Sequence, residues 1–304
     1  MKIIDSSIHS IMQTVWKKGM VIAGFNIPHL PMMEPVIRAL TETETFGLIM
    51  VARLEWMKFR AGSMQDICNE YQKLKDENFT RLHLDHVPVI DEDNLLVDYE
   101  RTIADAIEMG YNSVMVDGSR LTLDQNIKST AKVVKMAHAA GVPVESELGA
   151  VLGHEEGPLP PYEELFKSAK GFTSPEEARR FVEETETDWL SVAIGNIHGA
   201  ISETAKGQKK PAARLSISHL QKINELTRIP LVLHGGSGIK KEPLMEAFQN
   251  GIAKINIGTS IRQPYERMME NSVKKAQDAV YHEMLDVIEN QLEIKGNTRL
   301  LNTL

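Results

Sequence analysis

The stretch IPLVLHGGSG at residues 229–238 is a short apolar run that ends in a histidine and a glycine-rich turn. Three other apolar runs also end in polar residues, namely TRLHLDH at 80–86, VPVESELG at 142–149, and DWLSVAIGN at 188–196, which leads into His198. A closed (β/α)8 barrel brings the carboxyl ends of its parallel strands around one mouth, whereas an open sheet spreads them along an edge. The polar residues at these strand ends therefore favour the closed barrel.

Four further apolar runs complete a set of eight strand candidates, at residues 20–26, 46–53, 111–118 and 252–259. The segments between them place apolar residues near i, i+3, i+4 and i+7, and two of them end at Gly110 and Gly141. Strands that alternate with amphipathic helices are typical of an α/β protein with a parallel sheet. We therefore predict one (β/α)8 TIM-barrel domain over residues 1–304, a usual length for this fold.

Two connections and the carboxyl-terminal region stand out by their length. Residues 149–173 follow the fifth strand and residues 197–215 follow the sixth, and loops this long in a compact domain are usually functional. We expect both to be mobile lids over the mouth. Residues 260–290 are predicted to be a helical extension whose apolar stripe packs on the barrel or on a second subunit; the stripe comprises Val280, Met284, Val287 and Ile288.

The composition narrows the class of protein. Of the 304 residues, 42% are hydrophobic and 25% are charged, as in ordinary globular proteins, and the formal net charge of -8 argues against a nucleic-acid partner. The chain contains no run of about 18 uncharged apolar residues, so no membrane span is predicted, and the first residues do not have the pattern of a secretion signal. Cys68 is the only cysteine, so no intrachain disulfide can form. These features predict a cytoplasmic protein.

Three histidines follow three different strands, and we predict that they hold a divalent metal at the mouth: His86, His198 and His234. Three protein ligands with an open fourth position are typical of a catalytic metal site. Glu147 points from the fifth strand to the same mouth, either as a partner of a ligand or as an alternative metal ligand. His83 shares a strand face with Asp85 and is expected to contact the site residues without binding the metal itself.

Asp85 directly precedes a predicted ligand, so its carboxylate can reach the cavity and transfer a proton there; alternatively, it only orients a histidine. Glycine-containing turns follow the seventh and eighth strands, where these barrels usually bind phosphate, and they contain Ser237 and Thr259. The turns predict a phosphorylated substrate.

The order and spacing of the motifs over about residues 20–262 resemble those of class II ketose-bisphosphate aldolases. The motifs are HLDH at 83–86, VMVDGS at 114–119, VESELG at 144–149, HG at 198–199, LVLHGGSG at 231–238 and KINIGT at 254–259. The resemblance implies a zinc enzyme of carbohydrate metabolism, as in glycolysis. Such an enzyme reversibly cleaves a phosphorylated ketose into dihydroxyacetone phosphate and an aldehyde.

The resemblance also implies roles for single residues. His86, His198 and His234 would hold one catalytic Zn²⁺ ion, which polarises the donor carbonyl, and a monovalent cation would accompany it. Asp85 would be the acid/base at the C4 hydroxyl, and Glu155 would move the proton at the donor carbon. The substrate contacts would be Gly199, Gly235, Ser237 and Thr259 at the phosphate and Asn256 at the enediolate. A homodimer or homotetramer is expected.

Departures from the family pattern affect the substrate. Arg53 and Glu55 stand where many members have a small polar residue, and Gly258 replaces an acidic residue of bisphosphate-specific members. The segment after His198 lacks the usual tyrosine and lysine, so a cation for the phosphate would come from Lys206, Lys209 or Lys210. We therefore expect a specificity different from fructose 1,6-bisphosphate, with Arg53 as a substrate-binding residue.

Three alternatives stay open at this point. Lys254 on the eighth strand could form a Schiff base, although this mechanism leaves the three histidines unexplained. A metal-dependent hydrolase on the same fold would also use histidines and an aspartate. A non-catalytic sugar-phosphate binding barrel would keep the glycine turns but would need neither a metal nor Asp85.

Overall fold

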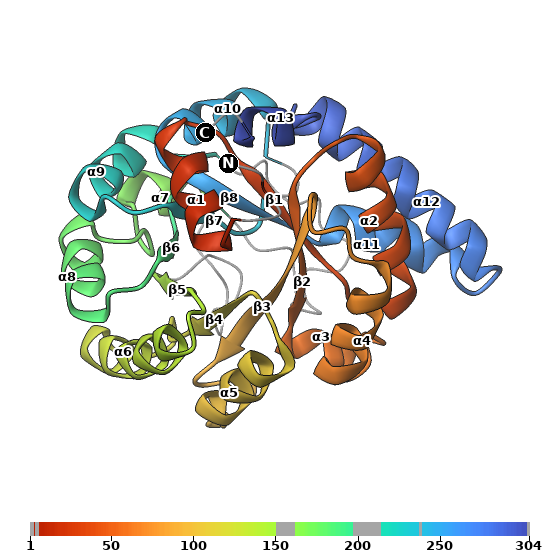
Figure 1. Cartoon of the computed structure of the whole chain (residues 1–304). Helices are drawn as coiled ribbons and strands as arrows, with labels where there is room; N and C mark the ends of the chain where they lie inside the picture. Colours follow the sequence, from red (N-terminus) through yellow and green to blue (C-terminus); the bar gives the residue numbers. More distant parts are fainter. Residues whose placement is uncertain (1–2, 4–5, 150–161, 197–213, 237–238, 303–304) are drawn as a thin grey trace.

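The fold is described from a computed structural model of the chain, which describes residues 3, 6–149, 162–196, 214–236 and 239–302. Within these residues, eight parallel strands follow one another in chain order and close into a barrel through pairing of the first strand with the last (Figure 1). The strands are β1 (Ile22–Asn26), β2 (Gly47–Ala52), β3 (Thr80–Pro88), β4 (Ser113–Asp117), β5 (Val144–Leu148), β6 (Trp189–Val192), β7 (Leu231–Leu233) and β8 (Ile252–Ile257). The predicted TIM barrel is confirmed.

Helices surround this barrel (Figure 1). In chain order they are α1 (Ile8–Lys17), η2 (Leu30–Met32), α2 (Met33–Glu42), α3 (Arg53–Lys58), α4 (Met64–Leu74), α5 (Tyr99–Met109), α6 (Leu123–Ala139), α7 (Tyr162–Ser168), α8 (Pro175–Thr185), α9 (Ile217–Thr227), α10 (Lys241–Gln249), α11 (Thr259–Met268), α12 (Val273–Asp286), η4 (Val287–Gln291) and α13 (Asn297–Leu301). Ser174 is the N-cap of α8, because its side chain accepts a hydrogen bond from the backbone N–H of Glu177.

The structure differs from expectation in two places, the connection after β5 and the helical stretch after β8. The first connection contains the helix α7, and the larger part of the predicted lids at 149–173 and 197–215, namely residues 150–161 and 197–213, lies outside the described residues. The helical stretch after β8 is divided into α11 and α12, because the side chain of Ser272 accepts a hydrogen bond from the N–H of Lys275 and starts a new helix.

The amino-terminal helix α1 covers one end of the barrel (Figure 1). Its buried residues Ile8, Ile11, Met12 and Val15 form one apolar cluster with side chains from β1, β2, β6, β7 and β8. The strand residues of this cluster include Trp189 at the start of β6. Because α1 covers this end, substrate access is expected at the opposite end, where the strands terminate.

The carboxyl-terminal extension packs on its own chain. The predicted apolar stripe on α12 and η4 is fully buried, at 0% exposure for Val280, Met284, Val287 and Ile288. Helix α12 lies against α2 and α11 in Figure 1, and the guanidinium of Arg38 lies 4.2 Å from the ring centroid of Tyr281 across the α2–α12 contact. The extension therefore stabilises the barrel from outside.

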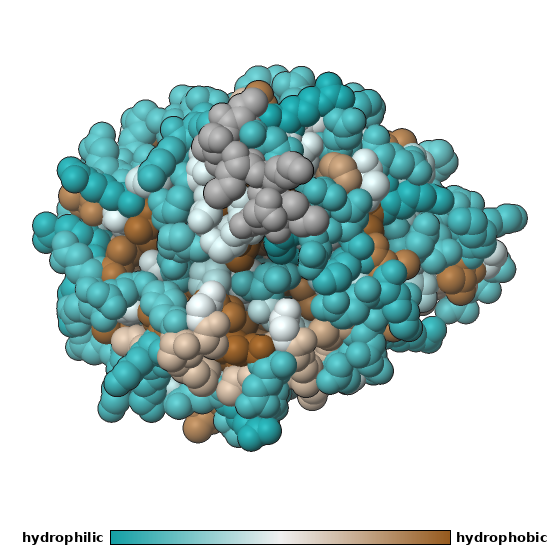
Figure 2. Space-filling model, viewed as in Figure 1, coloured by the Kyte–Doolittle hydropathy of each residue, from teal (hydrophilic) through white to brown (hydrophobic). Residues whose placement is uncertain are grey.

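Hydrophilic residues cover most of the molecular face shown in Figure 2. No described helix is both long enough and apolar enough to cross a membrane.

Candidate metal centre and active site

The site begins with an irregularity in β3. The pairing of β3 with β4 shifts register between Leu84 and Val87, and His86 has a φ of 35°. A regular strand would point the adjacent side chains of Asp85 and His86 to opposite faces. The left-handed backbone at His86 instead turns both side chains toward the same space. Such backbone strain costs on the order of 1–3 kcal/mol in a non-glycine residue and is common at functional sites.

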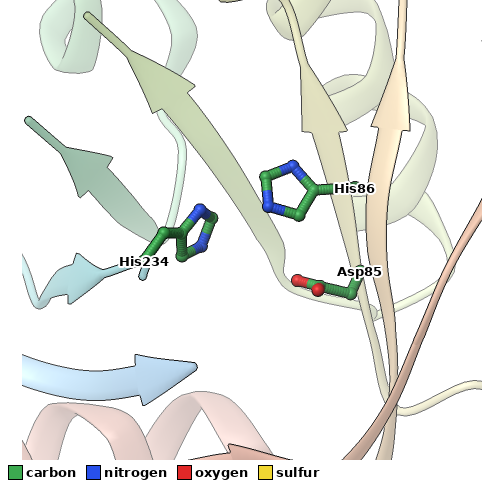
Figure 3. Close-up of side chains that lie close together, drawn as sticks. All are labelled: Asp85, His86 and His234. Atoms are coloured by element: carbon green, nitrogen blue, oxygen red, sulfur yellow. The ribbon is translucent and has the colours of Figure 1, made fainter. Parts of the chain in front are cut away.

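Asp85, His86 and His234 come together at the carboxyl ends of β3 and β7 (Figure 3). One ligand atom from each lies within 4.8 Å of the others, and the ring centroids of the two histidines are 4.5 Å apart. The space between these three side chains can therefore hold a metal ion.

Two carboxyl groups orient the ring of His86. Its Nδ1 lies 3.2 Å from Asp117 Oδ2 at the end of β4 and 3.9 Å from Glu147 Oε2 at the end of β5. Burial disfavours a charged ring, but the charges of Asp85, Asp117 and Glu147 outweigh burial and raise the pKa of His86 to about 10. Without a metal, the site therefore stabilises positive charge at this position.

His234 follows β7 and is fully buried. Its Nδ1 lies 2.9 Å from Glu147 Oε2, and its Nε2 lies 2.9 Å from Glu145 Oε1. The amide of Asn196, which follows β6, donates to the carbonyl of His234 at 2.9 Å. The ring is thus held on both sides and the backbone is fixed as well.

Asp85 is 1% exposed and is held by two amides. The side chain of Asn26 at the end of β1 donates to Oδ2 at 2.9 Å, and that of Asn256 on β8 donates to Oδ1 at 3.1 Å. Burial opposes ionisation of Asp85, but the neighbouring cations of His86 and Lys254 outweigh it and lower its pKa. Asp85 is therefore an oriented carboxylate that is able to accept a proton.

A second polar layer lies deeper in the barrel. Lys254 Nζ donates to Glu145 Oε2 at 2.7 Å and lies 3.9 Å from Asp85 Oδ1. His83 Nδ1 lies 2.8 Å from the hydroxyl of Ser113, and burial together with the charge of Lys254 lowers the pKa of His83 to about 3. The ammonium group of Lys254 is engaged with a carboxylate, which does not favour the attack on a carbonyl that a Schiff base requires.

The predicted phosphate contacts fall partly on described residues. Gly235 directly follows His234 and has a φ of 70°, and Thr259 is the first residue of α11. The amino end of α11 carries partial positive charge, which suits a phosphate. Gly199, Ser237, the metal-ligand candidate His198, the proton-transfer candidate Glu155, and Lys206, Lys209 and Lys210 lie outside the described residues.

Arg53 and Glu55 lie where β2 gives way to α3. The Nη1 of Arg53 is 3.5 Å from Asp91 Oδ2, in an ion pair that links α3 to the segment after β3. Glu55 is 9% exposed, and its Oε2 accepts a hydrogen bond from the N–H of Ala52 at 2.7 Å. Burial and the neighbouring charge of Asp85 raise the pKa of Glu55 to about 8, so a protonated carboxyl group lies near Asp85 at neutral pH.

Four residues of the site were not given roles from the sequence, namely Asn26, Asp117, Glu145 and Asn196. Asn26 and Asp117 are the last residues of their strands, and Asn196 follows the end of β6. Glu145 is two positions before Glu147. Their positions near strand ends could therefore have been noted from the sequence. Their contacts depend on how neighbouring strands are staggered, which the order of residues does not specify.

A closed eight-stranded barrel with histidines and carboxyl groups gathered at the carboxyl ends of its strands has the architecture of a metal-dependent barrel enzyme. The family model described as "Fructose-bisphosphate aldolase class-II" matches residues 6–298. The chain therefore belongs to the class II fructose-bisphosphate aldolase family, whose members are carbon–carbon lyases that act on sugar phosphates and use a divalent metal.

Individual relatives support this assignment. The chain is 33% identical to fructose-bisphosphate aldolase of Streptococcus pyogenes serotype M1 over 257 residues, which cover 83% of this chain and 78% of the relative. It is 31% identical to the Helicobacter pylori (strain J99) enzyme of that name over 280 residues, or 84% of this chain and 83% of the relative.

Solved structures agree with the fold. The YdjI aldolase from Escherichia coli K12 superposes with a TM-score of 0.75 at 27% identity, over 96% of this chain and 99% of that one. Fructose-bisphosphate aldolase from Campylobacter jejuni has a TM-score of 0.73 over 95% of both chains, and at 18% identity this likeness supports the fold alone. Membership of a lyase family favours the aldolase over the hydrolase and the non-catalytic binding barrel.

Proposed function

We propose that this protein is a zinc-dependent aldolase that reversibly cleaves a phosphorylated ketose into dihydroxyacetone phosphate and an aldehyde. The observation that carries the proposal is the strained backbone at His86, which directs a metal-binding imidazole and the carboxylate of Asp85 into one space with His234. A binding protein would have no evident use for this strain. An aldolase requires a Lewis acid and a base side by side.

The residues present suit a divalent metal. His86 and His234 would be two ligands, and His198 would be the third. Glu147 lies within 3.9 Å of a ring nitrogen of both His86 and His234 and would be an alternative ligand. A zinc ion held there supplies Lewis-acid polarisation of the donor carbonyl.

Asp85 would take the proton from the C4 hydroxyl as the C3–C4 bond breaks, and the bonding electron pair would remain on the donor fragment. The amides of Asn26 and Asn256 hold the carboxylate in position for this transfer. Glu155 would return a proton to the donor carbon and so complete dihydroxyacetone phosphate. In the condensation direction the same two groups would act in reverse order.

The donor phosphate would bind between the turns after β7 and β8. Gly235, Ser237 and Gly199 would offer backbone or hydroxyl groups, and Thr259 would contribute from the amino end of α11. The amide of Asn256 would stand between Asp85 and the donor fragment.

We also propose that the aldehyde partner is not glyceraldehyde 3-phosphate and that it carries a carboxylate. The ion pair of Arg53 with Asp91 involves Nη1 at 3.5 Å, and the planar guanidinium has five N–H donors, enough for a second, bidentate partner. The test is a retro-aldol screen of ketose mono- and bisphosphates, with and without a terminal carboxylate, coupled to detection of dihydroxyacetone phosphate. A kcat/KM for fructose 1,6-bisphosphate of about 10⁴ M⁻¹s⁻¹ or more would contradict the specificity. No dihydroxyacetone phosphate from any ketose phosphate would contradict the activity itself.

A further inference from the structure

Glu145 is a buried carboxylate that makes three close contacts beneath the proposed metal site. It is 0% exposed, and its Oε2 accepts hydrogen bonds from Trp189 Nε1 and from Lys254 Nζ, each at 2.7 Å. Its Oε1 lies 2.9 Å from His234 Nε2. An anion buried this deeply is tolerated only when partners satisfy it, and these three contacts satisfy both oxygens.

The contacts determine which atom carries the proton between Glu145 and His234. Oε2 of Glu145 accepts hydrogen bonds from the ammonium of Lys254 and from the indole N–H of Trp189, and a carboxyl group paired with an ammonium group at 2.7 Å is ionised. An ionised carboxylate only accepts hydrogen bonds. Nε2 of His234 is therefore the donor in the 2.9 Å contact.

The other ring nitrogen faces the opposite side. Nδ1 of His234 lies 2.9 Å from Glu147 Oε2, and this same oxygen lies 3.9 Å from Nδ1 of His86, the other histidine of the candidate metal cluster. We propose that Glu145 is a positioning residue that keeps a proton on Nε2 of His234 and thereby commits Nδ1 to the divalent metal. This inference rests on the proposed role of His234 as a ligand.

His86 shows the reverse arrangement. Its Nδ1 lies 3.2 Å from Asp117 Oδ2, so the close carboxylate from the neighbouring strand is at Nδ1 in His86, whereas Glu145 is at Nε2 in His234. Two carboxylates from different strands thus contact different nitrogens of the two rings. Glu145 of β5 contacts Nε2 of His234, and Asp117 of β4 contacts Nδ1 of His86. A carboxylate that fixes the tautomer of a metal-binding histidine typically contributes 10- to 100-fold to metal affinity.

Two matched variants separate this role from a purely structural one. Lys254→Met leaves the acceptor of His234 in place but removes the cation beside a buried carboxylate, so the fold should lose stability. Adding Glu145→Leu to Lys254→Met removes the leftover charge, so the fold should regain stability, but it also removes the acceptor. The two proteins differ only at residue 145.

Zinc affinity is measured by competition with a chromophoric chelator, and stability by the urea midpoint of the metal-free proteins. We expect the double variant to be more stable than Lys254→Met and yet to bind zinc about 10- to 100-fold more weakly. If Glu145 only neutralises Lys254, affinity will follow stability and the double variant will bind zinc at least as tightly, which would overturn the proposal.

The tautomer can be observed in the zinc-loaded wild-type protein. Long-range ¹H–¹⁵N spectra of the imidazoles report which nitrogen carries the proton, and the signals of His234 are those lost in His234→Asn. We expect the proton on Nε2; a proton on Nδ1 refutes the proposal even if both variants fail to fold. Neither readout uses a sugar, so release of dihydroxyacetone phosphate by wild type tests the proposed activity separately.

Discussion

Replacing Asp85 with Asn is the most direct test of the proposed base. Asn keeps the size of the side chain but replaces one acceptor oxygen with an NH₂ group. Both oxygens of Asp85 accept from amides, those of Asn26 and Asn256, so the new NH₂ will face one of these donors. One buried hydrogen bond will be lost, which costs about 1–3 kcal/mol of folding stability. A typical domain has about 5–15 kcal/mol and stays folded after this loss.

The loss of activity should be larger than the loss of stability can explain. General acid/base groups contribute about 10²- to 10⁴-fold, which corresponds to a barrier about 2.7–5.4 kcal/mol higher. Since nearly all molecules remain folded, a fall of this size in kcat reflects the missing proton acceptor. Enolisation at the donor carbon is assigned to Glu155 and should be affected less.

The assay compares carbon–carbon cleavage, zinc content and donor-proton exchange in the same preparation. Asp117→Asn is the matched control, because Asp117 contacts Nδ1 of His86 and its loss should weaken zinc binding about 10- to 100-fold. Retained zinc with lost cleavage in Asp85→Asn supports the base. If Asp85→Asn loses its zinc as the control does, Asp85 orients a ligand; if it still cleaves at the wild-type rate, the base lies elsewhere.

Three further predictions concern the metal, the loop and the pH dependence. Chelation should abolish cleavage and added zinc should restore it, while borohydride with substrate should not label Lys254; labelling that chelator leaves unchanged would establish a Schiff base instead. Glu155→Ala should slow proton exchange at the donor carbon more than it weakens substrate binding, and an unchanged exchange rate removes Glu155 from the mechanism. The pKa of Glu55 rises on folding from 4.5 to about 8, so its stabilising contribution is complete below pH 4.5 and is lost as the pH rises to about 8. As the pH rises across this window, Glu55→Gln should gain stability relative to wild type, by at most about 5 kcal/mol. The measurement is the free energy of unfolding in urea at several pH values. If this free energy changes with pH in the same way in both proteins, the pKa of Glu55 is not raised.

The sequence was sufficient to predict the barrel and the positions of His86 and His234 along it, because the relevant signal is local. Apolar runs that end in His86 or His234 identify strand ends, and strand ends in this fold share one mouth. It was not sufficient to predict how Asp85 and His86 face the same space. Strict alternation along β3 would separate them, and the register shift that joins them depends on pairing with β4.

The contacts that the site residues make were harder to predict from the sequence than the identity of these residues. Arg53 was expected to be available to a substrate, and the structure pairs it with Asp91, a residue of the segment after β3. Asn256 was expected at the donor fragment, and it hydrogen-bonds Asp85. In both cases the contact joins elements that are distant in the chain, so it follows from barrel closure and stagger.

Pairs of polar residues two positions apart on three strands explain how the barrel supports this chemistry. His83 with Asp85, Glu145 with Glu147 and Lys254 with Asn256 each point inward, because alternate residues of a strand share a face. The deeper member of each pair belongs to a layer in which the charges of Glu145 and Lys254 cancel and His83 is neutral.

In the upper layer, by contrast, protons on the two histidines balance the carboxylates. The pKa values of Asp85 and Asp117 are both lowered, so both carboxylates are ionised, and the pKa values of His86 and His234 are both raised. A divalent cation that binds there must displace protons from these rings, and zinc affinity should therefore increase with pH. Because the charges of the lower layer already cancel, this exchange of protons for a metal is confined to the mouth, where a metal and a phosphorylated substrate would meet.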